Sequence, residues 1–61
     1  MNRPTALLAE DEPLMRERLK EKLAEAWPEL DIVAEAEDGE QAMALFEEHR
    51  PQVAFLYVHM P

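Results

Sequence analysis

The sequence predicts an α/β fold in which three parallel strands alternate with two helices, and three observations support this. Short apolar runs of strand composition lie at 5–9, 31–35 and 53–58. Between these runs, apolar residues recur at helical spacing, and Pro28 and Pro51 end the two periodic segments. Strand–helix–strand units join parallel strands by right-handed crossovers. The predicted strand order is therefore 2-1-3, with one helix on each face of the sheet.

The first predicted strand, 5–9, is almost continuously apolar, as in a sheet that is covered on both faces. A helix is expected to begin at Pro13, because the missing N–H of proline has no partner in the first turn of a helix. One face of this helix is apolar and is predicted to pack in the core; it consists of Met15, Leu19, Leu23, Ala26 and Trp27.

The second half of the chain repeats the pattern. β-Branched residues favour a strand at 31–35. Asp38 is expected to cap the next helix, and Gln41, three residues later, to reach back as in a capping box. One face of this helix is shared by Ala42, Leu45, Phe46 and His49. The segment VAFLYV at 53–58 is the clearest strand signal in the sequence.

Composition excludes several classes of protein. The chain has 61 residues, enough for one small domain, and it has no cysteine for a disulfide or a thiolate metal site. A net charge of −8 argues against direct binding of nucleic acid by this segment. No apolar run approaches the roughly 20 residues of a membrane helix, and no signal peptide is visible. We therefore expect a cytoplasmic location and no membrane partner.

Three consecutive acids, Glu10-Asp11-Glu12, follow the first predicted strand directly. In open α/β sheets this carboxyl end of the strands is where ligands bind. Adjacent carboxylates about 4 Å apart repel by roughly 4 kcal/mol at an effective dielectric constant near 20. The acids therefore either stay solvated or hold a cation, and the sequence leaves both interpretations open.

Three segments together resemble a known family: LLAEDEPLMRERL, IVAEAEDGEQAMALF and RPQVAFLYVHMP. They are similar in order and spacing to the first half of the receiver domain of two-component response regulators, most of all those with a LytTR-type DNA-binding domain. The resemblance implies half of a flavodoxin-like doubly wound fold, with 1–61 as the truncated first half of a domain of about 120 residues. It also implies phosphorelay signalling, in which the intact parent is a transcriptional regulator that receives its phosphoryl group from a histidine kinase.

The resemblance also implies a site. In the family, two acids after the first strand, an aspartate at the end of the third strand and a backbone carbonyl two residues later bind Mg²⁺, and the aspartate accepts the phosphoryl group. These positions are Glu10, Asp11, Tyr57 and His59 here. Tyr57 stands at the acceptor position, and a phenol, which titrates near 10, is a poor nucleophile at neutral pH. We therefore expect no catalytic residue, no enzyme activity, no acyl phosphate and only weak or vestigial Mg²⁺ binding.

The third strand would lie at an edge of a 2-1-3 sheet, and an exposed apolar edge favours association. The sequence therefore predicts a homodimer through this strand, with Val53, Phe55 and Tyr57 at the interface and the strand order 2-1-3-3′-1′-2′. On this reading the module acts through protein–protein association. The alternative is a structural or engineered self-associating half-domain that has no signalling role.

Overall fold

The computed structural model describes residues 3–57 and contains three strands and two helices in the predicted order. All three strands are parallel and form one sheet in the order β2-β1-β3, as predicted. The predicted last residue of the third strand, Val58, lies outside the described residues. The elements are β1 (Thr5–Glu10), α1 (Pro13–Ala26), β2 (Asp31–Ala36), α2 (Gly39–His49) and β3 (Val53–Tyr57).

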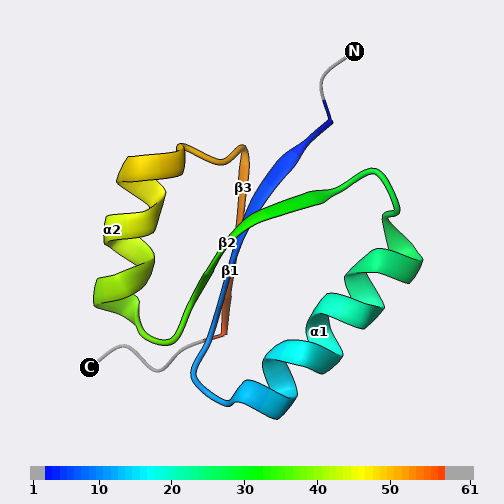
Figure 1. The fold of residues 1–61 in the computed structure, drawn as a ribbon, viewed down its shortest axis with the longest axis horizontal. Coiled ribbons are helices and arrows are strands. Elements are labelled where there is room, and N and C mark those ends of the chain that lie inside the picture. Colours follow the sequence, from blue (N-terminus) through cyan, green and yellow to red (C-terminus); the bar gives the residue numbers. More distant parts are fainter. Residues whose placement is uncertain (1–2, 58–61) are drawn as a thin grey trace.

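The two helices lie on opposite faces of the sheet, as Figure 1 shows. α2 packs over β2 and β1, whereas α1 packs over β1. Among the described elements, β3 packs closely only against β1. The central strand is therefore covered on both faces, with Leu7 and Leu8 fully buried on opposite sides. Neither helix, in contrast, packs closely against β3.

The hydrophobic cluster on the α2 face is small. Its buried members are Leu7 and four alanines, with Val33 and Leu45 packed against them; the alanines are Ala9, Ala34, Ala36 and Ala42. Small side chains allow α2 to approach the sheet closely, but they bury little apolar area. Since burial contributes about 25 cal/mol per Å², such a core stabilises the fold less than leucine or phenylalanine at the same positions would.

The boundaries of α1 agree with the prediction, but its packing does not. Pro13 occupies the first turn, and the helix ends at Ala26, because Trp27 precedes Pro28 and takes a non-helical conformation. No residue of α1 is buried. The prediction that the apolar face of this helix packs in the core is therefore wrong. Leu19 and Leu23 are only half-buried, and the other three members of the face are exposed, namely Met15, Ala26 and Trp27. The physical reason is that α1 lies over a single strand and no second element flanks it.

The start of α2 follows the predicted capping scheme with one change. The Asp38 carboxylate accepts the backbone N–H of Gln41 at 2.7 Å. The Gln41 side chain reaches back as expected, but it accepts the N–H of Glu37 at 2.6 Å and not that of the cap residue. The first bond satisfies an amide that the first turn leaves without a helical partner, and the second connects the residue before the cap to the helix.

The end of α2 is fixed by Arg50 and Pro51. Arg50 has φ 48° and ψ 55°, a left-handed conformation, and its N–H donates to the carbonyl of Phe46 at 2.8 Å. It is the one non-glycine residue with positive φ in the range 3–57. On the face that the sequence pattern indicates, Ala42 is buried and Leu45 half-buried, while Phe46 and His49 are exposed.

The pairing of β1 with β2 contains an irregularity that the sequence did not predict. Ala6 pairs with Ile32, but the next residue, Leu7, pairs with Ala34, so Val33 is the extra residue of a bulge. The bulge places Ala34 and Ala36 on the α2 face together with Leu7.

Neither helix of the described chain is long and apolar enough to cross a lipid bilayer.

Candidate functional site

The site lies at the carboxyl end of the sheet, where β1 and β3 end side by side. Glu10, the last residue of β1, is the register partner of Tyr57, the last residue of β3. Partners in register project from the same face of a sheet, and Leu56 faces α2, so Glu10 and Tyr57 lie on the α1 face. The structure thus brings together two of the predicted site residues. Their exposures differ: Glu10 is 7% exposed and Tyr57 is 51% exposed.

Glu10 is held by the turn that leads into α1. Its side-chain Oε1 accepts the backbone N–H of Glu12 at 3.2 Å. Its backbone carbonyl accepts a hydrogen bond from Nη1 of Arg16 at 2.8 Å. A nearly buried carboxylate requires such partners, because burial without them is costly. Asp11, the second predicted acid, follows directly and is exposed.

Two cations of α1 lie against the acidic end of the sheet. Nε of Arg16 is 3.5 Å from Oε1 of Glu35, and Nζ of Lys20 is 3.0 Å from Oε2 of the same carboxylate. Lys20 also lies 3.4 Å from Glu17. The hydrogen bond to Glu35 raises the pKa of Lys20, and the charges of Glu35 and Glu17 add to this effect against desolvation. Glu35, near the end of β2, is thereby neutralised by the neighbouring helix.

The prediction from sequence did not include this arrangement. A signal was nevertheless present: Arg16 and Lys20 are four residues apart, so they share one face of α1. Glu35 belongs to the strand that the same helix leads into. The spacing indicates a cationic face, but the pairing depends on where along the sheet the helix crosses, and the spacing alone does not specify that.

The donor groups do not form a complete site for Mg²⁺. Mg²⁺ takes six oxygen ligands in octahedral geometry, usually with one or two carboxylates. Within residues 3–57, no group of three or more histidine, aspartate or glutamate side chains is placed to hold a metal ion. Glu10 already accepts an amide, and the third position is the phenol of Tyr57. The carbonyl of His59, the other predicted ligand, lies outside the described residues.

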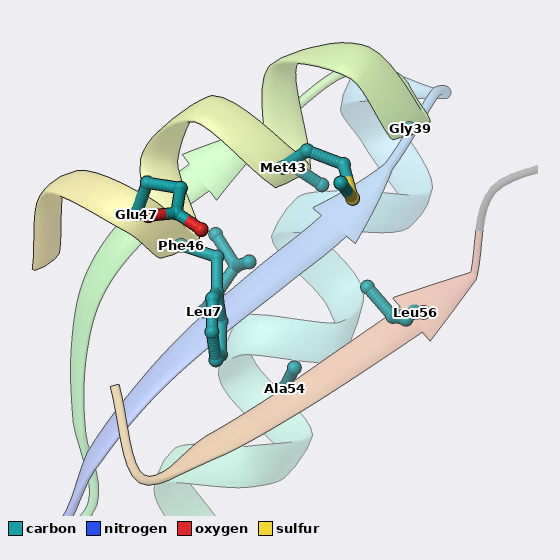
Figure 2. A pocket seen from close by; sticks show the side chains of 8 residues that line it. Leu7, Gly39, Met43, Phe46, Glu47, Ala54 and Leu56 are labelled. Carbon is teal, nitrogen blue, oxygen red and sulfur yellow. The ribbon is translucent and has the colours of Figure 1, made fainter. Parts of the chain in front are cut away.

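A second feature is an apolar groove of about 220 Å³ between α2 and β3. Figure 2 shows Met43 and Phe46 reaching toward the sheet from α2, and Ala54 and Leu56 on β3 across from them. Leu7 of β1 lies between the two sets. Three of the lining side chains are large and exposed: Met43, Phe46 and Leu56. The groove is therefore open apolar surface that the described chain does not cover.

The fold and the site define a class: a parallel α/β sheet with acids at the carboxyl end of its central strand. Comparison with protein families agrees with this class. Residues 6–61 match the model of the response regulator receiver domain. The chain belongs to this family.

Individual relatives support the same assignment. An uncharacterised response regulatory protein of Vibrio cholerae is 54% identical over 57 residues, which are 93% of this chain and 22% of that protein. The sensory transduction protein LytT of Oceanobacillus iheyensis is 44% identical, over 90% of this chain and 22% of its own length. A protein-glutamate methylesterase/protein-glutamine glutaminase of Carboxydothermus hydrogenoformans is 41% identical, over 100% of this chain and 18% of its own length. The chain thus spans less than a quarter of each of these relatives.

Proposed function

We propose that this chain is a receiver-type module of two-component signalling that does not accept a phosphoryl group at position 57 and acts through protein–protein contact. The observation that carries the proposal is Tyr57, which ends β3 beside Glu10. In the family that the chain resembles, the position that corresponds to Tyr57 holds the acceptor aspartate. The module itself catalyses no reaction.

The chemistry of the side chain at position 57 supports this proposal. An acceptor carboxylate is a charged nucleophile that attacks phosphorus, and it is also a ligand of the cation that neutralises the transferring group. The neutral phenol of Tyr57 supplies neither the charge nor the ligand. A base that removed its proton would have to lie within hydrogen-bond reach. The nearest acid by register is Glu10, whose carboxylate accepts the N–H of Glu12.

The relatives support a role as the input part of a larger protein. The same segment matches proteins named as regulators and proteins named as methylesterases, such as the transcriptional regulatory protein DegU of Brevibacillus brevis. A segment that is common to such different outputs does not itself determine the output. We therefore assign DNA binding to another part of a parent regulator of the LytTR type, in the cytoplasm, with a histidine kinase as the partner of the intact parent.

Mass spectrometry of the intact protein tests the proposal. The chain is incubated with acetyl phosphate and Mg²⁺, and the expected result is no stoichiometric gain of a phosphoryl group. A receiver domain with an intact aspartate, treated in parallel, confirms that the reagent is active. A stoichiometric gain of a phosphoryl group that peptide mapping places on Tyr57 would contradict the proposal; as an ester of a phenol it would be stable to base, which distinguishes it from an acyl phosphate on an acidic residue.

A further inference from the structure

We infer that Arg16 takes, at the carboxyl end of the sheet, the place that a divalent cation holds in a metal-dependent site. Its guanidinium links the ends of β1 and β2 and lowers the affinity of Glu10 and Asp11 for Mg²⁺. The basis is that the described oxygen groups at this end do not complete a magnesium site, while a cation of the chain itself already contacts them. The inference concerns the acids and α1, so it goes beyond the proposed function and does not depend on the chemistry of Tyr57.

Arg16 contacts the ends of two strands at once. Its Nη1 donates a hydrogen bond to the carbonyl of Glu10 at 2.8 Å, and this carbonyl belongs to the peptide group that joins Glu10 to Asp11. Its Nε lies 3.5 Å from Oε1 of Glu35, near the end of β2. A guanidinium suits this role because it presents several N–H donors in a fixed planar fork. A positive charge is therefore fixed on the backbone that carries both predicted metal ligands.

The start of α1 explains the position of Arg16. β1 ends at Glu10 and α1 begins at Pro13, so the helix leaves the sheet directly at its carboxyl end (Figure 1). The backbone N–H of Arg16 donates to the carbonyl of Glu12 at 2.9 Å and closes the first turn. Because long side chains of a helix point back toward its N-terminus, the side chain of Arg16 returns to the strand ends. It is 17% exposed there, so water screens its charge only in part.

Lys20 supports this arrangement from the next turn of α1. Its Nζ lies 3.0 Å from Oε2 of Glu35, so the two oxygens of that carboxylate contact two different cations. Glu35 is therefore held between Lys20 and Arg16, and it keeps the guanidinium turned toward the sheet. Two positive charges thus lie at the end of the sheet where the acids gather.

The acids have little left to offer a metal ion. The carboxylate of Glu10 is nearly buried, and its Oε1 accepts the N–H of Glu12 at 3.2 Å. Mg²⁺ gives up its bound water reluctantly and needs well-placed oxygens in return. In the part of the chain that the structure describes, no three acids or histidines are placed to supply them. A metal ion would have to displace the amide from Glu10 and approach the guanidinium on the backbone of the same residue.

Coulomb's law gives the size of the effect. A unit positive charge about 7 Å from a divalent cation lowers the affinity for that cation roughly sevenfold at the dielectric constant of water. The effect is larger where water is partly excluded and smaller in salt. Removal of the charge of Arg16 should therefore raise the affinity for a divalent cation about fivefold at low ionic strength.

Binding of Mn²⁺ to the whole chain tests the inference, since Mn²⁺ takes the same kinds of oxygen ligand as Mg²⁺ and its binding can be followed by water-proton relaxation. Arg16→Gln should bind Mn²⁺ about fivefold more tightly than the original chain. Arg16→Lys keeps the charge, and Arg18→Gln removes one from an exposed position of the same helix. Both should bind within about twofold of the original chain. Unchanged or weaker binding by Arg16→Gln, or an equal gain in either of the other two variants, would overturn the inference.

Paramagnetic broadening of amide signals by Mn²⁺ locates the bound ion. In Arg16→Gln the signals of Glu10 and Asp11 should broaden most, and broadening spread evenly over the acidic surface would contradict the inference. Circular dichroism verifies that each variant is folded. If Arg16→Gln does not fold, Lys20→Gln tests the same electrostatics with the hydrogen bond of Arg16 in place. It should bind Mn²⁺ about twofold more tightly than Lys22→Gln, and equal binding by these two would overturn the inference.

Discussion

Glu10 and Tyr57 end neighbouring parallel strands in register, so a nearly buried carboxylate lies beside a half-exposed phenol. The pair joins the two parts of the site that the sequence places 47 positions apart. On the other side of Glu10, α1 supplies Arg16, which binds the carbonyl of Glu10 and also contacts Glu35. The acidic end of the sheet is thus partly neutralised by the side chains of its own first helix.

Tyr57→Asp should couple folding to Mg²⁺. A second carboxylate in register with Glu10 repels it, so we expect a loss of about 1 kcal/mol in the free energy of unfolding without divalent cations. Millimolar Mg²⁺ should restore that loss, since the third acid completes a set of oxygen ligands. Thermal unfolding with and without Mg²⁺ measures the effect. The original chain and the uncharged Tyr57→Asn should respond only weakly, and a comparable response in either would contradict the explanation.

Arg16→Met should destabilise the fold. The Arg16 side chain is 17% exposed and connects α1 to the ends of β1 and β2. Hydrogen bonds to charged groups contribute about 1.5–3 kcal/mol, and we expect a loss in that range by urea unfolding. Arg18→Met, at an exposed position of the same helix, is the control and should change the free energy of unfolding by less than about 0.5 kcal/mol. Equal effects would show that Arg16 is an ordinary surface residue.

Asp38→Ala should remove the cap of α2. Its carboxylate accepts the N–H of Gln41 at 2.7 Å, and loss of such a cap costs about 1 kcal/mol. Asp38→Asn retains an acceptor and should lose only a few tenths of that amount. Urea denaturation of both variants distinguishes the hydrogen bond from the charge: similar losses in the two would assign the effect to the negative charge at the helix N-terminus.

Stability at high pH should depend on Lys20. The carboxylate of Glu35 raises the pKa of Lys20 above the usual 10.5, so the folded chain holds this proton more tightly than the unfolded chain. The resulting stabilisation is fully present below pH 10.5 and is lost as the pH rises through the raised pKa. Since the Lys20 side chain is 33% exposed, solvent screening limits the effect to a few tenths of a kcal/mol.

Urea unfolding at neutral pH and at about pH 11 tests this dependence. From neutral pH to about pH 11, the free energy of unfolding should fall further in the original chain than in Lys20→Gln. Lys22→Gln, at an exposed position, should behave like the original chain. If the loss is the same in all three proteins, the contact between Lys20 and Glu35 has no linkage to folding.

The element order and the helix ends could be predicted from sequence because local signals determine them. Pro13, Pro28, Asp38 and Pro51 act on the residues beside them, and their effects on the backbone do not depend on the rest of the fold. The order β2-β1-β3 is that of the doubly wound fold which the sequence resembles, and for this order right-handed crossovers place the two helices on opposite faces of the sheet.

Burial and side-chain pairing could not be predicted in the same way. The apolar stripe of α1 has the spacing of a core face, but its depth depends on whether another element flanks the helix, and none of the described elements does. The contact of Arg16 with Glu10 depends on the crossing position of α1 over the sheet. The bulge at Val33 depends on the fit of β2 against β1 and has no glycine to indicate it.

The β2 edge of the described sheet is poorly suited to accept a further strand. Asp31 and Glu35 place charges on this strand, and the bulge at Val33 interrupts the regular spacing of its backbone groups. This edge of the sheet is therefore protected against the edge-to-edge growth that leads to fibres.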